Sequence, residues 1–321
     1  DVEFLLLNVA EFDALKLDAT ALIADAHTGL TALTQALKHY RSRWGDEISL
    51  AREAWHDECR RLWMRDWHPD DAPEVAGHLD AQLAEYGDTL NTRLTQTRVL
   101  GLINQHIEDN AIVVGAAGSL PGDLQRLWQV KTPDSYHLEY GYSCMGYEIA
   151  AAIGAKLAKP QQPVYAAVGD GSYMMLHSEL QTAVQEGIKV TILLFDNASF
   201  GCINNLQMGH GMGSFGTENR HRNPLTGRLD GPLVKVDFAK NAESYGCRAW
   251  RVHDEQSLLT ALEASRAHPG PTLLDIKVLP KTMTHDYASW WRTGDAQVAE
   301  SLAVRHAAEQ TQEMLKKARQ Y

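Results

Sequence analysis

Val164-Tyr-Ala-Ala-Val-Gly-Asp-Gly-Ser172 and Val190-Thr-Ile-Leu-Leu-Phe-Asp-Asn197 are the two stretches that decide the fold of this chain. Each is an apolar run that ends in polar turn residues, a pattern typical of a buried strand. Between them, apolar residues recur at helical spacing, at Leu176, Leu180, Ala183 and Val184. A strand, a helix and a second strand in this order predict a βαβ unit with parallel strands.

The same alternation continues on both sides of this unit. It predicts further strands at 111–114, 247–252 and 272–278, and helices at 94–107, 147–157 and 257–267. Nearer the start, the pattern predicts a short strand at 4–9, a helix at 21–40 and a charged helix with an aromatic stripe within 41–68. We therefore predict an α/β fold built on a doubly wound parallel sheet.

The stretch Trp67-His-Pro-Asp-Asp-Ala-Pro73 is rich in turn residues and marks a linker. We predict a preceding unit with its linker at 1–75, the α/β domain at 76–280 and a C-terminal tail with a helix at 281–321. The chain starts at Asp1 rather than Met and runs almost at once into the apolar residues 4–7. We therefore expect a fragment whose natural N-terminus lies elsewhere.

Composition excludes several classes of protein. The chain has 321 residues, is 44% hydrophobic and carries a formal charge of −11, which argues against nucleic-acid or anionic-membrane binding. No apolar run approaches the ~20 residues of a membrane-spanning helix. Four cysteines lie far apart without a CxxC pair, so we interpret them as reduced thiols and expect a cytoplasmic protein.

Polar residues at the strand ends indicate where a ligand binds, because open α/β sheets bind ligands beyond the carboxyl ends of their strands. Asp170 lies in a glycine turn that suits an anion, and a cation resolves the conflict between its carboxylate and a phosphate. Asn197 lies 27 residues later, at the end of the next strand. Either turn alone is ordinary, but together they predict a site for a metal ion and a diphosphate.

This pairing of a Gly-Asp-Gly turn with a later Asn resembles the signature of thiamine diphosphate (ThDP) enzymes. The segment 142–155 resembles the part of the acetolactate synthase and pyruvate oxidase superfamily that packs under the thiazolium ring. The resemblance covers about 95–280, which it implies is the diphosphate-binding domain. Residues 1–40 resemble the end of that superfamily's middle domain, so the preceding unit is expected to be a remnant of it.

A narrower resemblance rests on several motifs. They are Glu139-Tyr-Gly-Tyr-Ser-Cys-Met-Gly-Tyr-Glu148, Phe200-Gly-Cys-Ile-Asn-Asn-Leu-Gln207, Gly213-Ser-Phe-Gly-Thr-Glu218, Leu279-Pro-Lys-Thr-Met283 and Ser289-Trp-Trp291. They resemble the trihydroxycyclohexane-1,2-dione hydrolases of myo-inositol catabolism. This implies hydrolytic C–C cleavage of a cyclic polyol dione to a 5-deoxyhexuronate, dependent on ThDP and Mg²⁺. It also implies a homodimer or homotetramer.

The resemblance assigns roles to residues of the two strand ends. Asp170 and Asn197 would bind Mg²⁺ through side-chain oxygens, and Ser199 through its backbone carbonyl. Gly171 and Ser172 would contact the diphosphate. These assignments agree with the oxygen ligands that Mg²⁺ prefers.

Four further residues are candidates for the cofactor and one for the substrate. Gly118 and Ser119 would contact the same anion, although a plain turn explains them equally. Met145 would hold the cofactor bent, where a core gap-filler is the alternative. The backbone around Cys144 would accept from the aminopyrimidine. His210 could donate to a substrate oxygen from a loop over the site, or be an ordinary solvated histidine.

The superfamily also needs a glutamate that activates the aminopyrimidine from a separate pyrimidine-binding domain. We find no residue in suitable context here, so we expect the isolated fragment to be inactive. Two alternatives stay open: an acetolactate-synthase-like carboligase acting on 2-keto acids, and a non-catalytic folded fragment. A Rossmann dehydrogenase is disfavoured, because the loop predicted at Gly115-Ala-Ala-Gly-Ser-Leu-Pro-Gly122 lacks the GxGxxG spacing.

Overall fold

The computed structural model describes residues 3–68, 83–139, 141–280 and 298–317. Contacts divide the chain into two compact units, residues 1–54 with 310–321 and residues 55–309. The domain boundaries predicted at 75 and 281 fall in ranges outside the described residues and stay predictions, as does most of the predicted linker. The Ser289–Trp291 motif also lies outside the described residues.

The smaller unit is built on a parallel pair of strands, β1 (Leu5–Asn8) and β2 (Thr20–Ile23), with Leu5 opposite Thr20. Its short helices are α1 (Glu11–Ala14), η1 (Lys16–Asp18) and α2 (Ala26–Ala36). The predicted strand at 4–9 is confirmed as β1. The single helix predicted at 21–40 is wrong, because β2 occupies its first residues and pairs with β1. Asp25 then caps α2 by accepting from the Thr28 amide.

Among the described helices, two have residues in both units. They are α3 (Glu47–Trp63), within the predicted charged region, and α13 (Leu302–Lys317), within the predicted tail. No helix in the described part of the chain is long and apolar enough to cross a membrane.

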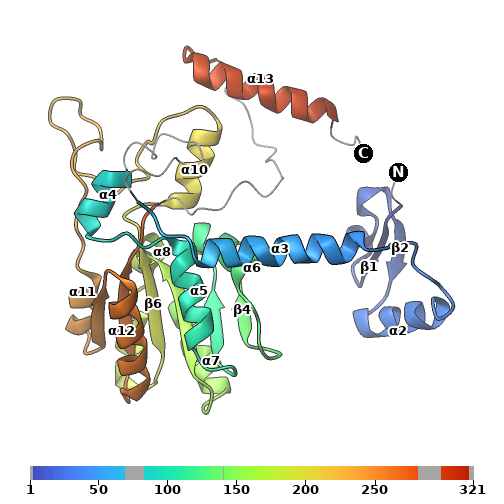
Figure 1. The fold of residues 1–321 in the computed structure, drawn as a ribbon, viewed down its shortest axis with the longest axis horizontal. Helices are drawn as coiled ribbons and strands as arrows, with labels where there is room; N and C mark the ends of the chain where they lie inside the picture. The colour runs from blue at the N-terminus through green and yellow to red at the C-terminus, as the bar shows by residue number, and fades with distance from the viewer. Residues whose placement is uncertain (1–2, 69–82, 140, 281–297, 318–321) are drawn as a thin grey trace. The chain divides into compact units, whose positions relative to one another are not determined.

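The larger unit contains a six-stranded parallel sheet of order β4-β3-β5-β6-β8-β7 (Figure 1). Its strands are β3 (Ile112–Gly115), β4 (Tyr136–Leu138), β5 (Val164–Gly169), β6 (Thr191–Asp196), β7 (Arg248–Val252) and β8 (Thr272–Lys277). The central pairs are in continuous register, with Gly169 opposite Phe195 and Asp196 opposite Lys277. The predicted doubly wound parallel sheet is therefore confirmed.

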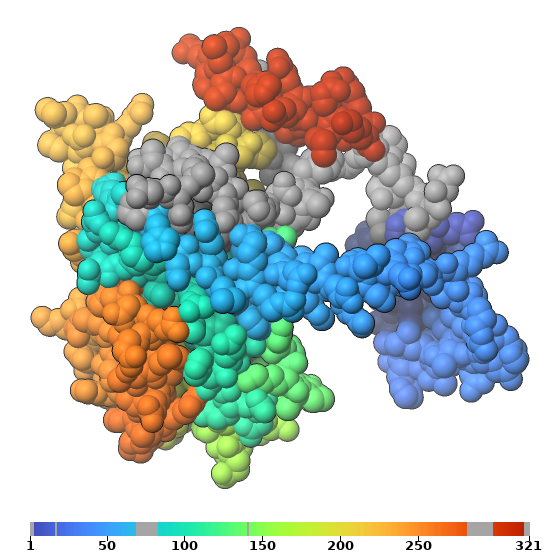
Figure 2. Space-filling model, viewed as in Figure 1, coloured from blue at the N-terminus to red at the C-terminus, as the bar shows by residue number. Residues whose placement is uncertain are grey.

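Helices cover both faces of this sheet, and side chains along β6 show it by alternating between two hydrophobic clusters. Leu193 and Phe195 pack with residues of α5 (Gln96–His106), α6 (Ser119–Leu127) and α12 (Glu255–Ala267). Ile192 and Leu194 pack with residues of α7 (Tyr147–Ala158), α9 (Glu179–Gln185) and α11 (Phe238–Ser244). Figure 2 shows α5 in teal and α12 in orange side by side over the first face. Burial on both faces explains why β5 and β6 are continuous apolar runs.

The described part of the larger unit also contains α4 (Leu83–Leu90), α8 (Asp170–Met175) and α10 (Gly201–Gly209). The loop predicted at 115–122 is shorter than expected, because α6 already begins at Ser119 after Gly118 with its φ of 96°. Pro121 fits there, since the first turn of a helix needs no intrahelical donor. The sequence patterns also gave no sign of β4, α10 and α11.

Candidate functional site

The carboxyl ends of β5 and β6 form the centre of the candidate site. Asp170 directly follows β5 and begins α8, while Asn197 directly follows β6. Because Gly169 pairs with Phe195, Asp170 and Asn197 follow neighbouring strands at the carboxyl end of the sheet. The topology therefore brings these residues together as expected, and their roles as ligands stay predictions.

The Asp170 carboxylate is buried, with 2% of the residue exposed. It accepts from the amides of Gly171 and Ser199, and from Asn219 Nδ2 at 3.3 Å. Burial and the neighbouring Asp196 carboxylate raise the pKa of Asp170 well above its ordinary value. Two adjacent buried carboxylates repel each other, so a cation would stabilise this arrangement.

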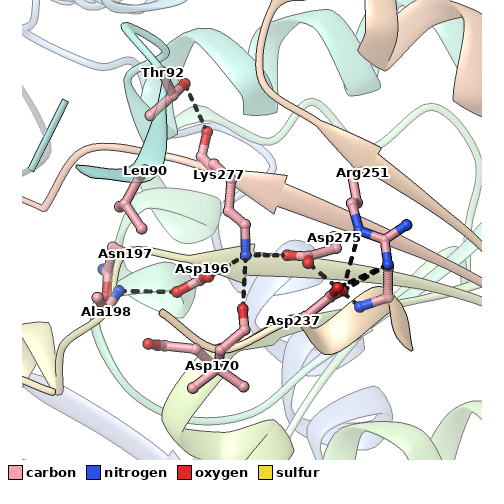
Figure 3. Close-up of polar contacts among 12 residues, drawn as sticks. Leu90, Thr92, Asp170, Asp196, Asn197, Ala198, Asp237, Arg251, Asp275 and Lys277 are labelled. Atoms are coloured by element: carbon pink, nitrogen blue, oxygen red, sulfur yellow. Dashed lines mark hydrogen bonds and ion pairs between the residues drawn. The ribbon is translucent and has the colours of Figure 1, made fainter. Parts of the chain in front are cut away.

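Lys277 supplies part of that positive charge from the end of β8 (Figure 3). Its Nζ lies 2.5 Å from Asp196 Oδ2 and 2.9 Å from Asp275 Oδ1, and it donates to the Val236 carbonyl at 3.3 Å. Together with Asp170, these groups hold three carboxylates and one ammonium. A divalent cation at Asp170 would balance the charge of this cluster, so the residues present fit a magnesium ion.

The residues predicted to bind Mg²⁺ are not a cluster of ionisable side chains. Within the described ranges, no group of three or more His, Cys, Asp or Glu side chains is placed to hold a metal ion. The predicted set has one carboxylate, the Asn197 amide and the Ser199 carbonyl. Asn197 Oδ1 accepts from both the amide and the hydroxyl of Ser199 at 3.0 Å. An amide oxygen has two lone pairs, so this oxygen could bind a cation once the Ser199 hydroxyl rotates away from it.

Ser172 and the first loop have different surroundings. The Ser172 hydroxyl is buried and donates to the Glu148 carboxylate at 2.8 Å, so it is directed inward. A Cβ placed on Gly201, the first residue of α10, would lie 3.1 Å from Ser119 Oγ and 3.6 Å from Asn197 Nδ2. The start of α6 therefore lies beside the loop after β6, where Gly118 and Ser119 were expected.

The backbone amides of the segment around Cys144 donate to the carboxylate of Glu139. Glu139 accepts from the Tyr142 amide at 2.9 Å and the Cys144 amide at 2.7 Å, and these bonds lower the pKa of Glu139. Cys144 is exposed and Met145 is half-buried. His210 directly follows α10 and is half-buried. The cofactor and substrate roles of Cys144, Met145 and His210 stay predictions.

Sequence reasoning missed four residues of this site: Asn219, Glu148, Asp275 and Lys277. The last two left a signal, because two charged residues interrupt the apolar strand Thr272-Leu-Leu-Asp-Ile-Lys277 at alternate positions. Alternate positions share one face of a strand, which indicates a buried ion pair when the strand is central.

We expect Gly171→Ala to destabilise the chain by about 1–3 kcal/mol, because added volume in a packed site forces its neighbours to move. A Cβ on Gly171 would lie 2.6 Å from Cε1 of the Phe200 ring. The matched control is Gly154→Ala in α7, where a Cβ meets nothing within 4 Å. That variant should gain roughly 0.5–1 kcal/mol, and urea unfolding of both would measure the difference. Equal stabilities for the two variants would contradict the packing argument.

Comparison with known proteins identifies the family of this site. The family model described as "Thiamine pyrophosphate enzyme, C-terminal TPP binding domain" matches residues 116–276; thiamine pyrophosphate is another name for thiamine diphosphate. A Rhodococcus jostii thiamine diphosphate-dependent 4-hydroxybenzoylformate decarboxylase superposes with a TM-score of 0.51 at 24% identity. The match covers 59% of this chain and 33% of that one, and it shows likeness of fold alone.

Curated relatives match over nearly the whole chain. A Geobacillus thermodenitrificans protein named 3D-(3,5/4)-trihydroxycyclohexane-1,2-dione hydrolase is 55% identical over 99% of this chain and 50% of its own length. A Bacillus cereus protein of the same name, numbered 2, is 54% identical over 100% of this chain and 50% of its own. The chain thus spans about half the length of these relatives. Since the family model covers half of the chain, including both strand ends of the site, the chain belongs to the thiamine pyrophosphate enzymes and contains their C-terminal TPP-binding domain.

Proposed function

We propose that the protein carrying this chain hydrolyses a 3D-(3,5/4)-trihydroxycyclohexane-1,2-dione to a 5-deoxyhexuronate, in inositol catabolism, with ThDP and Mg²⁺. The observation that carries this proposal is the 54–55% identity, over 99–100% of the chain, to relatives named for that substrate. The buried carboxylate pair at the carboxyl edge of the sheet supports the magnesium part.

The residues of this chain would hold the cofactor in two places. Asp170, Asn197 and the Ser199 carbonyl would bind Mg²⁺, while the start of α8 at Gly171 would present backbone amides to the diphosphate. The backbone near Cys144 would meet the aminopyrimidine. ThDP, when bound, supplies an electron sink next to the carbonyl under attack, and the protein positions it.

The proposal includes the partners and the location of the protein. The substrate would be a cyclic polyol dione, and the protein would assemble as a homodimer or homotetramer. A cytoplasmic location remains a prediction that rests on the cysteines. The structure records all four as free thiols: Cys59, Cys144, Cys202 and Cys247.

Product analysis tests this function directly. We expect the full-length parent to open the dione ring only when both ThDP and Mg²⁺ are supplied, and this 321-residue chain alone to show no turnover. Chromatography of the products should show the 5-deoxyhexuronate. Consumption of pyruvate with formation of a carboligation product would replace the proposal with the carboligase, and measurable hydrolysis by the isolated chain would overturn the expected need for a glutamate from another domain.

A further inference from the structure

Glu148 is a buried carboxylate that none of the cofactor assignments uses. It lies in the first turn of α7 and is 1% exposed. Its carboxylate accepts from the Ser172 hydroxyl at 2.8 Å, from the Gly146 amide at 3.1 Å and from the Ala117 amide. The Gly146 amide also donates to Ser172 Oγ at 2.7 Å, which closes a small hydrogen-bonded cluster.

The three donors come from three separate segments of the chain. Ala117 precedes the start of α6, Gly146 precedes α7, and Ser172 lies in α8 after β5. Each segment contains residues expected to contact the cofactor: Gly118 and Ser119 in the first, Cys144 and Met145 in the second, Gly171 and Ser172 in the third. One carboxylate therefore joins the parts of the site expected to hold the diphosphate and the aminopyrimidine.

We propose that Glu148 is a positioning residue that fixes these three segments relative to one another and so sets the distance between the two ends of the cofactor site. The inference rests on the proposed function, because the cofactor contacts of the segments are themselves proposals. Glu148 would not touch the cofactor. It would act through Ser172 and through the turn at Gly146.

The physical basis is the strength and the geometry of these bonds. Burial raises the pKa of Glu148, while the hydrogen bonds that it accepts act in the opposite direction. Hydrogen bonds to a carboxylate are roughly twice as strong as neutral ones, and the helix N-terminus also favours negative charge there. Gly146 has a φ of 91°, and a Cβ there would lie 2.9 Å from Leu176 Cβ. The turn therefore packs tightly on the end of α8, and its amide needs the acceptors that Glu148 and Ser172 provide.

Three variants separate the effects of the carboxylate. Glu148→Leu removes every acceptor and leaves buried donors unpaired, whereas Glu148→Gln keeps one acceptor oxygen. Ser172→Ala removes the bond from Ser172 to Glu148 and the bond from Gly146 to Ser172, and keeps the other two bonds to Glu148. It is the variant to use if Glu148→Leu does not fold. The matched control is Tyr165→Phe at the opposite end of β5. Tyr165 is 2% exposed, and its hydroxyl donates to Glu108 Oε2 at 2.8 Å.

The first readout is amide hydrogen exchange of this chain without cofactor. We expect Glu148→Leu to speed exchange in peptides covering 116–119, 141–147 and 170–176 together, with Glu148→Gln close to wild type. Ser172→Ala should speed exchange in the last two. Tyr165→Phe should leave all three peptides unchanged. Unchanged exchange in these peptides of Glu148→Leu would overturn the proposal, and so would equal changes in Tyr165→Phe.

The second readout is the affinity for ThDP with Mg²⁺, followed by tryptophan fluorescence. We expect Glu148→Leu to weaken binding by about 10- to 100-fold, as loss of residues that orient metal ligands does. Glu148→Gln should restore most of it, and Tyr165→Phe should bind like wild type. Wild-type affinity in a folded Glu148→Leu would overturn the inference alone. Failure of the wild-type chain and of its full-length parent to bind ThDP would overturn the proposed function, while the exchange data would still decide whether Glu148 fixes the segments.

Discussion

Asp170→Asn is expected to weaken magnesium-dependent ThDP binding by at least about 100-fold, or roughly 2.7 kcal/mol, while making the chain without cofactor more stable. The carboxylate is the one anionic ligand in the predicted magnesium set, and an amide oxygen is a much weaker ligand for a hard cation. Without the ion, however, burial and the neighbouring Asp196 carboxylate raise the pKa of Asp170. Replacing it should gain about 1–3 kcal/mol of stability, because the repulsion disappears.

The neutral side chain would also fit the local hydrogen bonds. An asparagine oxygen can accept from the Gly171 and Ser199 amides, which now donate to Asp170. Its amide nitrogen can donate to Asp196, at the cost that the half-buried Asn219 Nδ2, which donates to Asp170 Oδ2 at 3.3 Å, loses this acceptor. The gain in stability and the loss of cofactor affinity should therefore appear in the same variant, because the carboxylate that would bind the cation destabilises the chain when the cation is absent.

Calorimetric titration with ThDP and Mg²⁺, and thermal unfolding without them, measure the two effects separately. The control is Asp237→Asn, which removes a half-exposed carboxylate that pairs with Arg251 and caps α11. Asparagine also caps helices well, so this variant should keep the wild-type affinity and lose little stability. Wild-type magnesium dependence in Asp170→Asn would remove Asp170 from the ligand set.

The parts of the fold that sequence predicted best are those whose burial is complete. β5 and β6 are buried on both faces, so their apolar runs are long and end sharply at polar residues. β4 has only three residues at the sheet edge, with an exposed histidine between two half-buried side chains. So short an element leaves no periodicity to read, and it forms because β3 offers it a pairing partner.

The candidate site was predictable in position and less so in its contacts. The ends of β5 and β6 follow from parallel topology, so Asp170 and Asn197 were brought together as expected. The direction of the Ser172 hydroxyl depends on Glu148, which lies 24 residues earlier on another helix. The wrong prediction of a single helix at 21–40 has the same cause, since the first residues of that range form β2 and pair with β1. Long-range partners of this kind leave no local pattern.

Lys277→Met is expected to cause the largest loss of stability, about 3–5 kcal/mol, because it leaves two buried carboxylates without their cation. Asp275 is fully buried and Asp196 is 3% exposed, and both pair with Lys277 Nζ. The methionine side chain fills a similar volume, so the loss reports the charge rather than a cavity. Urea unfolding at neutral pH measures it.

The double variant Lys277→Met with Asp275→Asn shows whether charge is the cause. Removing one of the two uncompensated carboxylates should recover part of the loss, and the asparagine oxygen can still accept from the Ala239 amide. If the double variant is no more stable than Lys277→Met alone, packing rather than charge holds this part of the sheet.

The pH dependence gives an independent check on the same cluster. Burial and Asp196 raise the pKa of Asp275, while Lys277 lowers it. Without Lys277 the pKa of Asp275 in the folded chain should rise further above that of the unfolded chain. The folded state then binds protons more readily, so the deficit of Lys277→Met should shrink as the pH falls through this raised pKa. Unfolding of both proteins at about pH 8 and about pH 5.5 should show a smaller difference at the lower value, and a constant difference would mean that these carboxylates do not carry the effect.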